Sequence, residues 1–181
     1  MAVPPGVRAV RGGGGASRIP PIVVAGVTGS GKSTIGRLLA DRLRLPFLDA
    51  DDLHSAANRA KLHAGEPLDD ADRAPWLDRV GAAIAAAGTN VVACSALKLA
   101  YRDRLRKYAP DLVIVQLDVP VEELERRLAA RRGHFAAPSL LPSQLATLEP
   151  LLACERGFVM PATGDPAATV DAILSRGTMG A

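Results

Sequence analysis

Short apolar runs alternate along this chain with segments in which apolar residues recur every three or four positions. The runs have the length of buried strands, and the segments between them have the spacing of amphipathic helices. The predicted strands cover residues 22–27, 46–49, 90–95, 112–118 and 157–161. The predicted helices cover residues 32–44, 55–63, 75–87, 98–108, 120–132 and 166–176. This alternation indicates an α/β domain with a parallel sheet of about five strands and crossover helices.

Proline and glycine mark several helix boundaries. Pro75 and Pro120 suit the first turn of a helix, and Gly88 and Gly177 suit the position that follows a last turn. We therefore expect helices to begin near the two prolines and to end near the two glycines.

Two segments lack a regular pattern. Residues 1–19 are rich in glycine and proline and predict a disordered tail, which leaves residues 20–181 as one folded domain. Residues 133–150 have poor periodicity and hold three prolines, after an arginine-rich helix. They predict either a mobile lid around 131–150 or an ordinary irregular connection.

Composition narrows the classes of function. The chain has 181 residues, 48% hydrophobic and 23% charged, with a net charge of +3, which is typical of one globular domain. Aromatic residues make up only 3%, which disfavours a base-stacking surface for nucleic acid. No apolar run approaches the roughly 20 residues that cross a membrane. Cys94 and Cys154 are too few for a disulfide framework or a zinc site, and Cys94 lies in an apolar run as an inert core thiol would. We expect a cytoplasmic protein.

Residues 26–33 read Gly-Val-Thr-Gly-Ser-Gly-Lys-Ser and lie between a predicted strand and a predicted helix. This is the G-x-x-x-x-G-K-[ST] pattern of a phosphate-binding P-loop, whose glycines let backbone N–H groups surround phosphate oxygens. The helix that follows directs its positive end at the same phosphates. Lys32 reaches the β- and γ-phosphates, and the Ser33 hydroxyl can ligate Mg²⁺. The predicted ATP contacts in and beside this loop are Gly26, Thr28, Gly29, Ser30, Gly31, Lys32, Ser33 and Thr34.

Two carboxylates follow the second predicted strand. Asp49 and Asp51 are two residues apart, so in an extended segment they share a face, at the strand end where ligands bind in open α/β sheets. We assign Asp49 to Mg²⁺ together with Ser33, and Asp51 to the proton of an acceptor hydroxyl. A helix-capping aspartate with solvated neighbours is the alternative interpretation.

Beyond the P-loop, several blocks resemble the P-loop gluconokinases. In chain order, these blocks are Asp49-Ala50-Asp51-Asp52-Leu53-His54, Gly65-Glu66-Pro67-Leu68-Asp69-Asp70, Asp72-Arg73, Pro75-Trp76-Leu77, Cys94-Ser95-Ala96-Leu97-Lys98, Tyr101-Arg102-Asp103 and Arg131-Arg132-Gly133-His134-Phe135. The resemblance runs from about residue 22 to 150. It implies a three-layer fold like that of nucleoside monophosphate kinases, and transfer of the ATP γ-phosphate to the 6-hydroxyl of D-gluconate with Mg²⁺. It also implies a possible homodimer.

D-Gluconate offers a carboxylate and a row of hydroxyls, so its site needs a cation and several polar groups at fixed positions. The predicted acceptor contacts are Asp51, His54, Arg73, Ser95, Lys98, Arg102 and His134. Arg73 could instead pair with Asp69 or Asp70, and Lys98 and Arg102 could form a solvated helix face.

Arg127 and Arg131 lie four residues apart on one predicted helix face, just before the predicted lid. The resemblance implies that both contact ATP. An arginine beside the transferring phosphoryl group can contribute about 10³–10⁵ in rate, so we assign Arg131 a catalytic role together with Lys32 and Asp51. For Arg127, a surface ion pair with Glu123 is the alternative.

Two other functions compete with a gluconokinase. One is a P-loop kinase for another small molecule, of the shikimate type or for another sugar acid. The other is a non-catalytic switch that binds ATP and signals to a partner. The presence of Lys32, Ser33, Asp49 and Asp51 favours catalysis over the switch.

Overall fold

The structure is a computed structural model that describes residues 19–130 and 138–176. Its centre is one five-stranded sheet with the strand order β2-β3-β1-β4-β5, and all neighbouring strands are parallel. The strands are β1 (Ile22–Ala25), β2 (Phe47–Asp49), β3 (Val91–Ala93), β4 (Val113–Asp118) and β5 (Gly157–Pro161). The predicted α/β class and the parallel sheet are confirmed.

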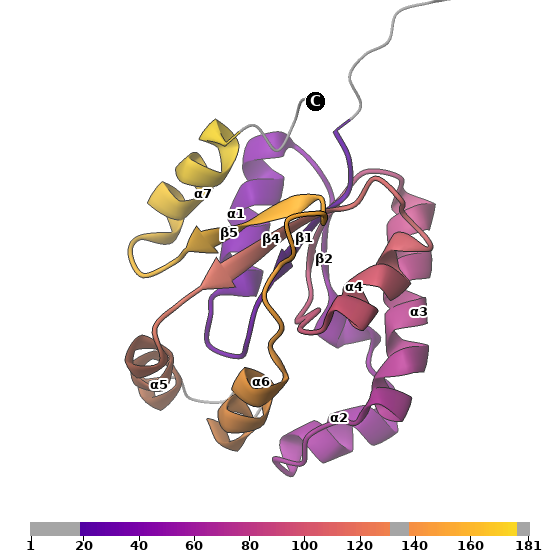
Figure 1. Cartoon of the computed structure of the whole chain (residues 1–181), viewed down its shortest axis with the longest axis vertical. Helices are drawn as coiled ribbons and strands as arrows, with labels where there is room; N and C mark the ends of the chain where they lie inside the picture. The colour runs from indigo at the N-terminus through magenta and orange to yellow at the C-terminus, as the bar shows by residue number, and fades with distance from the viewer. Residues whose placement is uncertain (1–18, 131–137, 177–181) are drawn as a thin grey trace, which may run out of the picture.

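Helices cover both faces of the sheet, which gives three layers (Figure 1). The helices are α1 (Lys32–Leu43), α2 (Ala56–His63), α3 (Asp70–Ala87), α4 (Leu99–Arg106), α5 (Val121–Ala130), α6 (Leu141–Thr147) and α7 (Pro166–Ser175). Two short 3₁₀ helices, η1 (Ala50–Leu53) and η2 (Pro138–Leu140), complete the described elements. Helices α1 and α7 lie on one face, and α3 and α4 lie on the other.

Alternate residues of β1 belong to different cores. Ile22 and Val24 pack in the cluster that includes residues of α1, α5 and α7, whereas Val23 and Ala25 pack with residues of α3 and α4. A parallel strand that is buried on both faces reads as a continuous apolar run, which is why the pattern of this segment was visible in the sequence.

Helix α3 begins earlier than the sequence suggested. Pro75 lies inside the helix rather than in its first turn. The helix begins at Asp70, because Asp69 and Asp72 form a capping box: the Asp72 N–H donates to Asp69 Oδ1 at 2.7 Å, and the Asp69 N–H donates to Asp72 Oδ2 at 3.2 Å. Gly88 caps the other end of α3, as predicted.

The irregular segment that was predicted as a lid holds a packed helix in its second half. Leu140 and Leu141 are buried, and Leu145 and Leu148 pack against the core of the α1 face. Residues 131–137 lie outside the described residues, and so do residues 1–18 of the predicted tail and Gly177. The lid around residues 131–150 stays a prediction.

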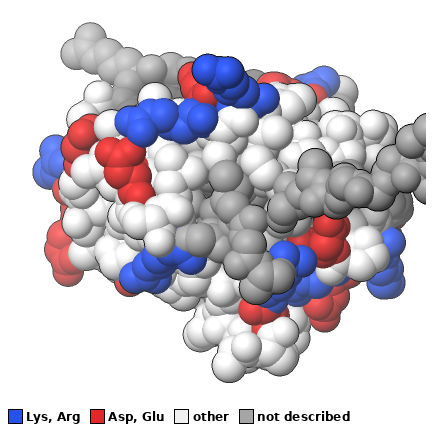
Figure 2. Space-filling model, turned by 90° about the horizontal axis from the view of Figure 1, so that it is seen from above, with Lys and Arg blue, Asp and Glu red and all other residues white. Residues whose placement is uncertain are grey.

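The described surface is mixed in charge. Figure 2 shows one face on which Lys and Arg side chains lie among Asp and Glu, with uncharged residues between them. Mixed charge of this kind is typical of a solvated surface. Within the two described ranges, no helix combines the length and the apolar character needed to span a bilayer.

Candidate active site

The P-loop takes the conformation that its glycines predict. Gly29 and Gly31 have φ values of 80° and 93°, a region that L side chains rarely adopt, and a Cβ on Gly29 would meet Leu128 at 3.1 Å. Gly31 is the N-cap of α1, so the helix begins where the loop closes. The Lys32 Nζ donates to the Val27 carbonyl across the loop at 2.8 Å. The loop thus brings the lysine and the positive end of α1 to one place.

Ser33 and Asp49 meet beside this loop. Ser33 lies in the first turn of α1 and Asp49 at the end of β2, and the Ser33 Oγ donates to Asp49 Oδ2 at 2.7 Å. The other carboxylate oxygen, Asp49 Oδ1, accepts from the Asp51 N–H at 3.2 Å. Two adjacent oxygen ligands of this kind fit Mg²⁺, which takes one or two protein ligands together with phosphate oxygens and water. Residues 19–130 and 138–176 hold no cluster of three His, Cys, Asp or Glu side chains suited to a metal.

Asp51 is the second residue of η1, which follows directly after β2. About half of its side chain (51%) is exposed, and protein atoms crowd the rest. This partial desolvation raises the pKa of Asp51 above its usual value, with smaller contributions from Asp49 and Asp52, while Lys32 and Arg73 oppose the rise. A carboxylate with a raised pKa is a better proton acceptor than an ordinary aspartate.

His54 is buried against Trp76. The two rings stack with centroids 4.3 Å apart, and His54 Nε2 lies 3.8 Å from Asp51 Oδ1. Burial, and then the charges of Arg73, Arg79 and Arg59, lower the pKa of His54 to about 4. His54 is therefore neutral at pH 7, where its imidazole can donate one hydrogen bond and accept another. Trp76 is fully buried, and its Nε1 donates to the Ala50 carbonyl at 2.7 Å.

Arg73 is a buried guanidinium beside this group. It is only 7% exposed, its Nε donates to the Leu68 carbonyl at 3.2 Å, and its Cζ lies 5.7 Å from the Tyr101 ring centre. No carboxylate of the described residues lies within 4.0 Å of it, so the alternative of a pair with Asp69 or Asp70 is not seen. A buried cation usually has an anionic partner, so Arg73 is the best placed group to receive a carboxylate.

Lys98 has a partner already. Its Nζ lies 2.8 Å from Asp70 Oδ1, which also accepts from the Tyr101 hydroxyl. These side chains line an open groove with a volume of about 520 Å³. The groove residues are Leu68, Asp69, Asp70, Ala71, Lys98, Tyr101 and Thr147. Ser95 follows β3 closely, and its carbonyl accepts from the Gly26 N–H at 3.3 Å, which places Ser95 beside the P-loop.

Arg102 has a different role from the one predicted. It is fully buried, and both Nε and Nη2 donate to the Glu155 carboxylate at 2.7 Å. Its other bonds go to the backbone carbonyls of Ala96, Leu97, Glu149 and Pro150. The guanidinium therefore joins α4 to the segment after α6 and is not available to a substrate.

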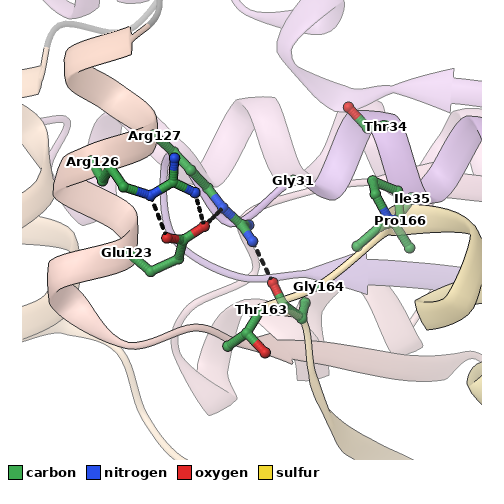
Figure 3. Close-up of a pocket in the computed structure, with 10 residues that line it drawn as sticks. Gly31, Thr34, Ile35, Glu123, Arg126, Arg127, Thr163, Gly164 and Pro166 are labelled. Atoms are coloured by element: carbon green, nitrogen blue, oxygen red, sulfur yellow. Dashed lines mark hydrogen bonds and ion pairs between the residues drawn. The ribbon is translucent and has the colours of Figure 1, made fainter.

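A second pocket lies between the P-loop and the loop after β5 (Figure 3). It has a volume of about 260 Å³. Its lining residues are Gly31, Thr34, Ile35, Glu123, Arg126, Arg127, Ala162, Thr163, Gly164 and Pro166. The side chains of Arg127 and Glu123 both reach this pocket, so the two interpretations of Arg127 are compatible: it pairs with Glu123 at 2.7 Å and also donates to the Ala162 carbonyl at 2.7 Å. Hydrogen bonds from Arg126 and Arg127 lower the pKa of Glu123 to about 2.

Several predicted contacts have other partners or cannot be placed. The Thr28 N–H donates to Gln144 Oε1 at 2.7 Å, and the Ser30 side chain is fully buried. Arg131 and His134 lie outside the described residues. The sequence reasoning missed Gln144 and the pocket residues after β5, because neither belongs to a motif with a fixed spacing.

The comparisons with known proteins agree with this geometry. The family model described as "Shikimate kinase" matches residues 28–156. A gluconokinase of Gluconobacter oxydans is 48% identical over 71% of this chain and 74% of its own length. Among solved structures, a gluconokinase from Sinorhizobium meliloti is 40% identical with a TM-score of 0.79, covering 87% of this chain and 93% of its own. A sugar kinase from a Janibacter species is also 40% identical, with a TM-score of 0.85 over 90% of this chain and 96% of its own.

Three findings indicate the same family. The fold is that of a shikimate-kinase-like P-loop protein, and Ser33 pairs with Asp49 beside the loop. The chain is also 40–48% identical to gluconokinases over most of its length. The chain belongs to the P-loop gluconokinase family.

Proposed function

We propose that this protein transfers the γ-phosphate of ATP to the 6-hydroxyl of D-gluconate and so forms 6-phospho-D-gluconate and ADP. The family and its P-loop support ATP as the phosphate donor. The acceptor is proposed from the gluconokinase relatives and from the polar groups that converge beside the loop.

On the phosphate side, the chain supplies cations and backbone donors. Lys32 and the N-terminus of α1 offset the negative charge of the phosphates, as does Arg127 from the neighbouring pocket. Ser33 and Asp49 would hold Mg²⁺, which when bound offsets charge on the phosphate oxygens. We propose the pocket of Arg127, Thr163 and Pro166 for the rest of the nucleotide.

On the acceptor side, Asp51 takes the proton of the 6-hydroxyl as the oxygen attacks the γ-phosphorus. Its raised pKa suits this step, and its place beside Asp49 keeps it next to the phosphates. His54 and Ser95 provide neutral hydrogen-bonding groups for hydroxyls. We assign the substrate carboxylate to Arg73 and the far end of the acceptor to Lys98 in the groove. Roles for Arg131 and His134 and a homodimer remain predictions from the resemblance, and a cytoplasmic location remains a prediction from the composition.

The observation that supports an acidic acceptor best is the buried Arg73 guanidinium, which has no described carboxylate within the 4.0 Å of an ion pair and feels Asp51 and Asp70 only from further away. Burial of an unpaired charge is costly, and an anionic substrate would supply the missing partner. A neutral sugar would leave this charge unpaired.

The test is ADP release from ATP and Mg²⁺, with and without D-gluconate. We expect strong stimulation by D-gluconate and little by D-glucose or glycerate. A site that hydrogen-bonds substrate groups can reject analogues that lack them by about 10⁴–10⁵. The proposal fails if another acid gives the higher kcat/KM.

Shikimate is the most informative competing acceptor, because the family model that matches residues 28–156 is described by that activity. A higher kcat/KM with shikimate would leave the phosphate side intact and replace the acceptor. ATP binding without turnover of any acceptor would favour the non-catalytic switch.

A further inference from the structure

One amide of the P-loop is bonded to a side chain from a distant part of the chain. The Thr28 N–H donates to Gln144 Oε1 at 2.7 Å, in a half-buried position, across 116 residues of sequence. Because a backbone N–H can only donate, the oxygen of the Gln144 amide must face the loop. Among the described residues, no partner is found for Gln144 Nε2, which keeps both of its N–H donors.

The position of Gln144 is set by packing that does not involve the loop amide. Gln144 lies on α6, where the buried Leu141 and the partly buried Leu145 and Leu148 join the core of the α1 face. Directly after α6, the Glu149 N–H donates to the Leu97 carbonyl at 2.9 Å. Gln144 is therefore held by the domain and can in turn hold the loop.

The segment after α6 is also tied to α4. The Glu149 carboxylate accepts from the Leu99 N–H at 2.6 Å, at the N-terminus of α4, and the Arg102 Nη1 donates to the Glu149 carbonyl at 3.3 Å. These bonds fix the C-terminal end of α6 and limit how far Gln144 can move away from Thr28.

The same face of α6 reaches the acceptor groove. Thr147 is three residues after Gln144, so the two side chains are neighbours on the helix surface, and Thr147 lines the groove of Lys98 and Tyr101. Helix α6 therefore contacts both the phosphate-binding loop and the groove.

We propose that Gln144 is a positioning residue for ATP: its amide oxygen holds Thr28 so that the remaining N–H groups of the loop face the phosphates. A glycine-rich loop has many accessible conformations, and a bond from a packed helix lowers the entropy that phosphate binding must otherwise remove. A neutral amide suits this place, because a carboxylate would accept the same bond but repel the phosphates. The inference rests on the P-loop as the ATP site and not on the identity of the acceptor.

Three variants of the full chain test the proposal. Gln144→Ala removes the bond. Gln144→Glu keeps an acceptor for Thr28 but adds a negative charge. Ala146→Gln puts a glutamine on the exposed side of α6 and is the matched control. The dissociation constants of Mg²⁺-ATP and Mg²⁺-ADP are measured by calorimetry without acceptor, and thermal unfolding is followed in parallel.

We expect Gln144→Ala to lower the affinity for ATP about five- to tenfold, which corresponds to the loss of one hydrogen bond. Gln144→Glu should lower the affinity for ATP at least as much. The loss of affinity should be larger for ATP than for ADP, because ATP carries the extra phosphate charge. Ala146→Gln should bind like the unaltered chain, and the KM for D-gluconate should change less than twofold in all three.

Two results would overturn the proposal. One is ATP affinity within about twofold of the unaltered chain in Gln144→Ala or in Gln144→Glu. The other is an equal loss in Ala146→Gln. If the unaltered chain binds ATP but does not phosphorylate D-gluconate, the proposed acceptor fails, and the affinity order of the variants still decides the role of Gln144.

Discussion

The phosphate half and the acceptor half of the site differ in how their groups were brought together. The phosphate half rests largely on residues 26–33, one continuous loop in which Lys32 bonds to the Val27 carbonyl and Ser33 bonds to Asp49. The acceptor half draws on separate segments after β2 and β3 and on α3 and α4. In the first case the loop itself sets the geometry. In the second, each side chain can also find a protein partner.

Competition between protein partners and the substrate decides which of the candidate side chains remain available. His54 is neutral at pH 7, Lys98 pairs with Asp70, and Arg102 pairs with Glu155. Arg73 is buried with no carboxylate of the described residues in ion-pair range. The sequence predicted all four residues as contacts of the acceptor, and the structure gives them different surroundings and partners.

The largest effect is expected in the phosphate half. Lys32→Ala should lower kcat by about 10³-fold, because Lys32 offsets charge that develops on the phosphoryl group. The measurement is acceptor-dependent ADP release, with an unchanged thermal unfolding curve as the control. Activity within threefold of the unaltered chain would show that the phosphate half lies elsewhere.

Arg102→Met should affect stability rather than catalysis. Removal of Arg102 leaves the buried carboxylate of Glu155 without its main partner, which is strongly destabilising. We expect the loss of unfolding free energy to be limited to about 3 kcal/mol, because Arg106 still lies 2.8 Å from Glu155. Tm should fall by about 10 °C, and the double variant with Glu155→Gln should recover part of the loss. A stable Arg102→Met protein with a raised KM for D-gluconate would return Arg102 to the acceptor half.

Asp51→Asn should lower kcat by about 10²-fold through loss of the proton acceptor. In the unaltered chain the base must be ionised, so kcat/KM should fall as pH drops through the pKa of Asp51. Because partial burial raises that pKa, the loss should occur above the ordinary value of 3.8. A pH profile of kcat/KM checks this, and the acid limb should be absent from Asp51→Asn; the same limb in both proteins would contradict the assignment.

Arg73→Lys is the matched partner of the Arg102 experiment. It keeps the charge but loses the planar fork that binds a carboxylate, so kcat/KM for D-gluconate should fall about tenfold or more. Tm should move much less than in Arg102→Met, because Arg73 has no buried carboxylate partner to abandon. Steady-state kinetics with D-gluconate as the varied substrate measure the effect, and an unchanged kcat/KM would remove Arg73 from the acceptor half.

Asp49→Asn should have the smallest effect, a loss of about tenfold in the apparent affinity for Mg²⁺. The substitution weakens one proposed ligand of the metal, while the neighbouring ligand Ser33 is unchanged. Titration of activity with Mg²⁺ at saturating ATP measures it, and the KM for D-gluconate serves as the internal control. If Asp49→Asn abolishes acid–base behaviour while Asp51→Asn shifts the Mg²⁺ dependence, the two roles are reversed.

Local chemistry made part of the fold predictable. The inner strands β1, β3 and β4 were found because their apolar runs are buried on both faces. The edge strand β5 is only partly buried and still agrees with the predicted range 157–161. The start of α3 was missed, because the Asp69 and Asp72 capping box, rather than Pro75, begins that helix. Helix α6 was missed because it is short and has a proline near its start, and its leucines are explained only by their packing against the core of the α1 face.

The sequence by itself determined the P-loop, the strand-and-helix alternation and the pair of aspartates after β2, because each depends on residues near one another in the chain. Only the tertiary structure decided that Arg102 serves Glu155, that burial keeps His54 neutral and that Gln144 reaches Thr28. The physical reason is that pairing and desolvation depend on which side chains share a low-dielectric space. Residues as distant in sequence as Arg102 and Glu155 meet only in the folded chain.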